Sequence, residues 1–186
     1  MELFGQQGFK ATSIVQIEKA AGLSEGAGSI YHHFRTKQAL LEAGIERHLD
    51  RLRALRDIRA IFTDLGDLAI ELTMLGRYAL TEIDNESDLL KVMLAEARSR
   101  PELISTAVDQ LVDATYAGFA DWLQERAGLP AERANTLAAV GLGSLFSSRL
   151  LRLTLGRDPI PVSDEDYIAA WVHMIHAQIS SAAGTS

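Results

Sequence analysis

Apolar residues recur at helical spacing along most of this chain. Ile14, Ile17 and Ala21 share one face near the start, and the last segment repeats apolar positions at intervals of three and four residues. No alternating pattern is long enough to indicate a strand. The pattern therefore predicts an all-α protein, with helices over Leu40 to about Ala54, Asp67–Glu82, Glu86–Ser99, Pro101–Arg126, Ala131–Leu155 and Ser163–Ser181.

The first forty residues carry the signals of two short helices joined by a tight turn. Ser13 can cap the first of these helices, and Gln16 can complete a capping box with it. Gly22 suits the left-handed position that ends a helix, and Leu23 would then lie inside the turn. Ser24 is a natural cap for the next helix. This layout is typical of a helix-turn-helix DNA-binding unit.

The same stretch resembles the N-terminal domain of TetR-type transcriptional regulators. The resemblance covers roughly the first fifty residues and rests on Leu3-Phe4, Gly8-Phe9, Thr12-Ser13, Ile17, Ala21-Gly22-Leu23-Ser24, Gly26, Tyr31-His32-His33-Phe34, Lys37 and Leu40. It implies a three-helix DNA-binding domain over residues 1–48. A helical domain for effector binding and dimerisation would follow over residues 49–186.

Three features depart from the family pattern. The chain opens at Met1-Glu2, so the first helix is expected to be truncated at its N-terminus. Glu18 stands where the family usually has alanine, and because a carboxylate is repelled by phosphates we expect it to point away from DNA. The spacing from Ser24 to Tyr31 is two residues longer than the commonest family pattern. We interpret residues 25–28 as a loosened start to the recognition helix.

The resemblance places phosphate contacts at Tyr31 and Lys37, through a hydroxyl and an ammonium group. The ordinary alternative is a packed aromatic ring and a solvated charge. Further phosphate contacts are expected where hydroxyl side chains lie at helix starts, at Thr12, Ser13 and Ser24.

Base contacts are expected from the start of the recognition helix. The candidates are side chains that can accept or donate hydrogen bonds or touch a thymine methyl group: Glu25, Ala27, Ser29 and His32. Gly26 and Gly28 would allow the backbone to approach DNA closely, or they only relieve the local conformation.

Two helices of the rear domain suggest a dimer interface. Small residues recur over residues 138–148, where they would let helices approach closely. The last helix has one apolar face with Trp171, Met174, Ile175, Gln178 and Ile179. These helices suit the four-helix dimer bundle of TetR relatives; the alternative is that both faces pack inside one chain.

Aromatic and methionine side chains in the middle helices suit an effector pocket of the kind that TetR relatives hold. These candidates are Met74, Tyr78, Met93, Tyr116, Phe119 and Trp122, and the alternative for each is ordinary core. Arg149 interrupts an apolar run. It can pair with an effector carboxylate or, as we favour, with an acidic side chain of the protein.

Composition narrows the function further. The chain has 186 residues and no cysteine, which excludes thiolate catalysis and cysteine zinc sites. His173 and His176 lie three apart, but zinc needs further ligands, so we expect no metal and no cofactor. No signal peptide or membrane-length apolar run is visible, which favours a cytoplasmic protein.

Charged residues are distributed unevenly along the chain. Residues 1–60 hold nine Lys/Arg and seven Asp/Glu, a balance of +2, whereas the remainder holds nine and eighteen, a balance of −9. Because DNA affinity depends on local phosphate neutralisation, an acidic rear domain is compatible with DNA binding.

The sequence thus predicts a non-enzymatic transcriptional regulator, most often a repressor. It would bind a palindromic double-stranded DNA operator as a homodimer and respond to a small hydrophobic effector. The first alternative is a DNA-binding regulator without an effector, whose rear domain serves only dimerisation. The second is a helical ligand-binding or enzymatic protein with a vestigial DNA-binding unit.

Overall fold

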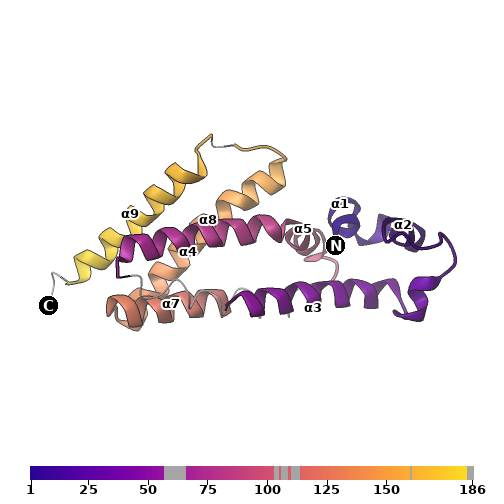
Figure 1. The fold of residues 1–186 in the computed structure, drawn as a ribbon, viewed down its shortest axis with the longest axis horizontal. Coiled ribbons are helices and arrows are strands. Elements are labelled where there is room, and N and C mark those ends of the chain that lie inside the picture. Colours follow the sequence, from indigo (N-terminus) through magenta and orange to yellow (C-terminus); the bar gives the residue numbers. More distant parts are fainter. Residues whose placement is uncertain (57–65, 103–104, 106–108, 110–113, 160, 184–186) are drawn as a thin grey trace. The chain divides into compact units, whose positions relative to one another are not determined.

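The computed structural model describes residues 1–56, 66–102, 105, 109, 114–159 and 161–183. Every regular element in these ranges is helical, and no strand occurs in them, which confirms the predicted all-α class (Figure 1). None of the helices in the described ranges is both long enough and apolar enough to cross a membrane. The residues divide into two compact units, one of Met1–Arg53 with Glu86–Gln110 and one of Ala54–Asn85 with Leu111–Ser186.

The first unit combines the N-terminal helices with a helix from the middle of the chain. Its elements are α1 (Glu2–Ala11), α2 (Ile14–Ala20), the 3₁₀-helix η1 (Ser29–His32), most of α3 (Lys37–Arg56) and α5 (Ser87–Glu96). This grouping reflects packing alone. The division by function at residues 48 and 49 stays a prediction.

Helix α1 packs along α5 in the first unit. The two helices approach closely at Gly5, where a Cβ atom would lie 3.1 Å from the Asp88 carbonyl oxygen. Phe4 and Leu89 are buried in this unit, together with Leu41 of α3. The side chains of His48 and Glu86 form a hydrogen bond that ties α3 to the start of α5. A helix from the middle of the chain therefore supports α1 directly.

The second unit is a bundle of α4 (Leu68–Asn85), α7 (Ala114–Ala127), α8 (Ala131–Leu155) and α9 (Asp164–Ala183). Its apolar core includes Leu72, Leu123 and Leu145, which are almost completely buried. A half-buried ion pair adds to this core, because the buried Glu71 accepts two hydrogen bonds from the partly exposed Arg126 at 2.8 and 3.1 Å. Both partners of that pair gain charge-assisted hydrogen bonds, which compensate for the free-energy cost of removing the charged groups from water.

The small residues of α8 serve packing within the chain. A Cβ atom at Gly141 would lie 2.9 Å from Cδ1 of Ile175. The indole of Trp171 donates to the Gly141 carbonyl at 2.9 Å, and the Tyr167 hydroxyl donates to the Ser144 carbonyl at 2.7 Å. Small side chains are needed here because α9 brings large ones onto the backbone of α8.

This packing corrects the dimer face predicted from the last helix. Trp171, Ile175 and Ile179 are buried within a single chain, whereas Met174 and Gln178 are exposed. We interpreted this face as part of an interface between two chains. For its buried residues, the structure shows the alternative, which is packing inside one chain. Periodicity identifies a face that is buried but carries no information about which chain covers it.

The predicted segments agree with the structure where local signals are strong. Helix α8 has the predicted bounds, and α9 begins one residue after the predicted position. Most of the predicted junction over residues 55–66 lies outside the described residues. The same holds for most of the first half of the predicted segment Pro101–Arg126, whose second half is α7.

Arg149 joins three helices of the second unit. Its guanidinium is buried and donates to Asp164 of α9 at 2.6 and 2.9 Å and to Asp84 of α4 at 3.1 Å. The hydrogen bond with Asp164 raises the pKa of Arg149 despite burial, and the same bond lowers the pKa of Asp164. The internal pairing that we favoured for Arg149 is thereby confirmed.

Because the pKa of Asp164 is lowered from 3.8 on folding, the pair stabilises the fold at higher pH and is lost as pH falls through the lowered value. We expect Asp164→Asn to lower the melting temperature at pH 7 by at most about 3 °C, since solvent screens the exposed carboxylate.

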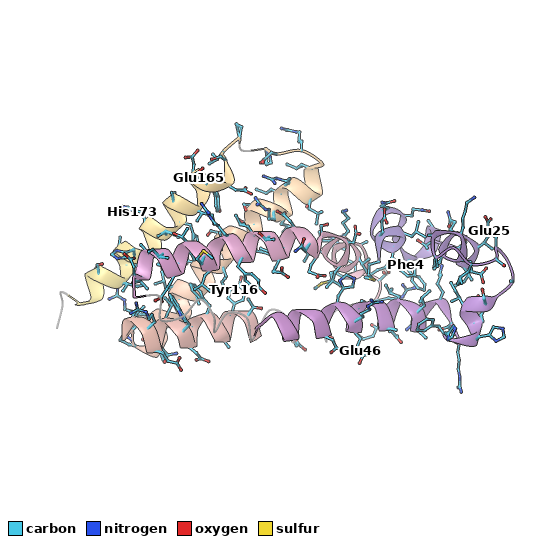
Figure 2. The ribbon with its side chains drawn as sticks, viewed as in Figure 1. Phe4, Glu25, Glu46, Tyr116, Glu165 and His173 are labelled. Carbon is cyan, nitrogen blue, oxygen red and sulfur yellow. The ribbon has the colours of Figure 1, made fainter. Side chains whose placement is uncertain are left out.

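Thermal denaturation from pH 7 downward measures this effect, with Glu165→Gln on the exposed side of α9 as the matched control (Figure 2). The gap between wild type and Asp164→Asn should close below pH 3.8. A gap that stays constant with pH would contradict a role for the Asp164 charge.

Candidate nucleic-acid interface

The start of α2 is fixed by the predicted capping box. The Ser13 hydroxyl accepts a hydrogen bond from the Gln16 backbone N–H at 3.2 Å, and the Gln16 side chain accepts one from the Ser13 N–H at 2.7 Å. Ser13 is exposed. Helix α2 therefore presents a capped N-terminus to solvent, and such an end attracts anions.

The end of α2 has the hydrogen bonds of a Schellman motif. Gly22 takes the left-handed conformation at φ 68°, as predicted. The N–H of Leu23 donates to the Glu18 carbonyl at 2.8 Å, and that of Gly22 donates to the Lys19 carbonyl at 3.1 Å. The prediction that Leu23 lies inside the turn is wrong, because its side chain is 42% exposed.

A buried carboxylate holds the inside of the turn and of the loop that follows. Glu18 is completely buried, and it accepts hydrogen bonds from the Gly26 N–H at 2.9 Å and the Ser29 hydroxyl at 3.3 Å. The expectation that Glu18 would turn away from DNA agrees with this burial. Its role goes further, since it fixes the loop that carries the predicted base contacts.

The segment after the turn contains no α-helix. Gly26 and Gly28 have φ values of 73° and 66°, which loosens residues 25–28 as predicted. The remainder is the 3₁₀ turn η1, whose N-cap is Gly28. The predictions of an α-helical recognition helix and of Ser24 as its cap are therefore wrong. Two left-handed glycines, Gly26 and Gly28, interrupt the helix, and the carboxylate of Glu18 stabilises the loop that stands in its place.

Most of the predicted DNA-contact residues are exposed, at the start of α2, along this loop and on η1. Tyr31 has 52% of its surface exposed. Glu25 is exposed at the edge of the unit and lies 3.5 Å from Lys19 (Figure 2). The other exposed positions are Ser13, Ser24, Gly26, Ala27 and His32, whereas Gly28 and Ser29 are half-buried. Their roles in DNA binding stay predictions.

Two predicted phosphate ligands are directed inward. Thr12 is 1% exposed, and its hydroxyl donates to the carbonyls of Gly8 at 2.8 Å and Leu3 at 3.1 Å. The ammonium of Lys37 donates to the carbonyls of Phe9 and Thr12, both at 2.7 Å. The resemblance placed Lys37 near DNA, and the position of Thr12 at a helix start suggested the same for its hydroxyl, but neither argument could identify the carbonyl groups that these side chains bind.

The predicted effector residues fall in both units. Phe119 is buried in the second unit, and its ring stacks on Trp122 at 5.7 Å and on Trp171 at 6.1 Å between centroids. Met74 is 37% exposed on α4. Tyr78 and Tyr116 are half-buried in the same unit, and Met93 lies on α5 of the first unit. The position of Phe119 is therefore that of an ordinary core residue, which was the alternative to a place in an effector pocket.

Metal ligands do not gather in the described part of the chain. Within it, no group of three or more histidine, aspartate and glutamate side chains is placed to hold an ion. His173 and His176 are exposed on α9.

Comparisons with known proteins find similarity to bacterial transcriptional regulators. Residues 1–43 match the family of bacterial regulatory proteins called tetR. The chain is 24% identical over 167 residues to the uncharacterized HTH-type transcriptional regulator YvkB of Bacillus subtilis strain 168, a match that covers 89% of this chain and 85% of that protein. The crystal structure of a Rhodococcus sp. protein assigned to the TetR-family transcriptional regulators superposes with a TM-score of 0.60 at 20% identity, covering 96% of this chain and 93% of that one.

Removal of the Glu18 carboxylate should destabilise the first unit. Glu18→Ala leaves the Gly26 N–H and the Ser29 hydroxyl without their acceptor, and we expect the free energy of unfolding to fall by about 1–3 kcal/mol. Glu18→Gln keeps one acceptor oxygen and should lose less. Urea denaturation measures both, with the exposed Glu42→Gln as control. Equal stability of Glu18→Ala and wild type would show that the loop does not depend on this carboxylate.

Proposed function

Because this chain is a DNA-binding transcriptional regulator of the TetR family, we propose that it is a repressor that binds a palindromic operator as a homodimer. The observation that carries the DNA-binding part of this proposal is the surface of the first unit, where the capped start of α2 and the loop to η1 are exposed and the buried Glu18 of α2 holds that loop. Residues 1–48 would supply DNA binding in each chain, and a regulator of DNA works in the cytoplasm of a bacterium.

The proposed DNA contacts divide by chemistry. Ser13 and the backbone N–H groups at the start of α2 would bind a phosphate, as would the exposed hydroxyl of Tyr31. Glu25, Ala27 and His32 would face base edges from the loop and η1. Because the loop is not an α-helix, Gly26 and Gly28 would let the backbone itself lie close to the groove.

Dimerisation is supported by apolar side chains that the chain leaves uncovered on α8. Val140, Leu151 and Leu155 are between 43% and 53% exposed. Met174 of α9 is another exposed apolar side chain. We propose that a second copy covers these side chains. Two-fold symmetry would then place two DNA-binding units about 34–36 Å apart, which is one turn of DNA.

The proposed response to an effector is a shift between two conformations of the dimer. A small hydrophobic ligand in the helical domain of residues 49–186 would favour the conformation that binds the operator less tightly. Tyr78, Tyr116 and Trp122 support this role, since they are half-buried aromatic side chains with polar atoms. Arg149 would act by holding α4, α8 and α9 together, because its guanidinium already binds two carboxylates.

The alternative is a regulator without an effector, whose rear domain only dimerises. One observation favours it. Phe119 is buried and stacked on two tryptophan rings, so this part of the bundle is already filled by its own side chains.

Selection from random DNA duplexes at near-physiological salt tests the proposed DNA binding. We expect wild type to recover an inverted repeat, and Tyr31→Phe to bind it on the order of tenfold more weakly because one hydroxyl–phosphate contact per chain is lost. Tyr167→Phe, in the second unit, is the matched control. Recovery of no preferred sequence by wild type would overturn the proposal.

A thermal-shift screen with hydrophobic metabolites separates the two alternatives. A ligand that binds the folded protein at 100 times its Kd should stabilise it by about 2.7 kcal/mol, which raises the melting temperature by several degrees. The same compound should weaken operator binding. If no compound raises the melting temperature, the regulator without an effector becomes the better interpretation.

A further inference from the structure

An exposed ion pair connects the end of α2 with the loop that follows it. The ammonium of Lys19 lies 3.5 Å from Oε1 of Glu25, and the two side chains are 72% and 52% exposed. Exposed ion pairs between long side chains contribute little to stability, because water screens the attraction and ordering both side chains costs entropy. The stability of the fold therefore does not account for this pair.

The backbone sets the distance between the two positions that carry these charges. Lys19 directly follows the buried Glu18 on α2. Glu25 directly precedes Gly26, whose N–H donates to the Glu18 carboxylate at 2.9 Å. One buried hydrogen bond thus holds both positions. Figure 2 shows Glu25 at the outer edge of the unit, where its side chain is open to solvent.

The pair belongs to the surface that we propose to bind DNA. Lys19 comes three residues after Gln16, so it continues the exposed face of α2 that begins at the capping box. Glu25 lies in the exposed loop that leads to η1. Phosphates repel a carboxylate on such a surface unless a cation lies beside it, and Lys19 supplies that cation. Glu25 can therefore come close to DNA at little electrostatic cost.

Both members of the pair keep hydrogen-bonding capacity for a further partner. An ammonium group has three N–H donors and a carboxylate has two acceptor oxygens, and the contact between Lys19 and Glu25 uses one of each. Further N–H donors of Lys19 and the Oε2 atom of Glu25 are left. The pair therefore presents a hydrogen-bond donor and an acceptor side by side.

The major-groove edge of a C·G base pair is complementary to this arrangement. Cytosine N4 donates there, and guanine O6 and N7 accept. Because N4 and O6 are hydrogen-bonded to each other within the base pair, they lie about 3 Å apart, close to the 3.5 Å between Lys19 Nζ and Glu25 Oε1. A T·A pair has the reverse arrangement, with an acceptor at thymine O4 and a donor at adenine N6.

We propose that Lys19 and Glu25 together recognise one C·G base pair in each half of the operator. Glu25 accepts a hydrogen bond from cytosine N4, and Lys19 donates one to guanine O6 or N7. This inference rests on the proposed DNA binding and deepens it. It names a base pair that the operator contains, and it adds Lys19 to the residues that determine specificity.

Replacement of base pairs in the operator that wild type selects tests the proposal. Each C·G pair of the half-site is changed in turn to T·A, in both halves. We expect one position at which this change weakens wild-type binding on the order of tenfold per half-site. At that same position, Lys19→Met and Glu25→Met should each bind the two operators about equally. Because both side chains are exposed, both variants should keep the melting temperature of wild type.

The double variant Lys19→Glu, Glu25→Lys is a sharper test. It keeps the net charge and the ion pair, but it exchanges the donor with the acceptor. We expect it to bind the operator with T·A at the identified position more tightly than the operator with C·G. A continued preference for C·G, or no preference between the two, would overturn the proposal.

A phosphate contact by Lys19 would give a different result. Lys19→Met would then weaken binding to every operator by the same factor and leave discrimination between base pairs unchanged. That outcome would overturn the proposal, as would a loss of discrimination at different positions in the two single variants. Lys91→Met is the control for the lost charge, since Lys91 pairs with Asp88 on α5 of the same unit. It should change neither affinity nor discrimination.

The same measurements separate failure of this proposal from failure of the proposed function. If wild type selects an inverted repeat and both single variants discriminate its C·G pairs as wild type does, the protein is a sequence-specific DNA-binding protein and the role of the ion pair is refuted. If wild type selects no preferred sequence, both the proposed function and this inference fail.

Discussion

A buried carboxylate needs hydrogen-bond donors close by, and the surface that we propose to bind DNA is built around one. Glu18 lies on the inner side of α2 and receives the Gly26 N–H and the Ser29 hydroxyl. The loop after α2, where a recognition helix was predicted, folds onto the Glu18 carboxylate. Because the cost of burying an unpaired carboxylate is large, the loop and the carboxylate stabilise each other.

Several charged side chains in the described part of this chain join helices. Lys37 binds the carbonyls at the end of α1, Glu71 and Arg126 join α4 to α7, and Arg149 joins α8 to α4 and α9. A charged side chain that interrupts an apolar pattern should therefore be considered first as a partner in an ion pair within the fold, and only then as a ligand contact. Arg149 could have bound an effector carboxylate or an acidic side chain of the protein, and the fold has the internal pairing that we favoured.

The sequence predicted those parts of the site that depend on near neighbours. The capping box of Ser13 and Gln16 and the left-handed Gly22 involve residues no more than five apart, so their chemistry can be read directly along the chain. The α-helical recognition helix was wrong because Glu18 acts from eleven residues away on Ser29. The inward direction of Lys37 was missed because its acceptors lie 25 and 28 residues earlier.

By itself the sequence determined the all-α class, the bounds of α8 and the helix-turn-helix start, since periodicity and caps are local properties. Only the tertiary structure decided which partner each face meets. Trp171 and Ile175 pack against Gly141 of the same chain, α5 supports α1, and Thr12 is buried. An amphipathic pattern records that a face is covered, whereas the covering surface is chosen by packing between residues far apart in the chain.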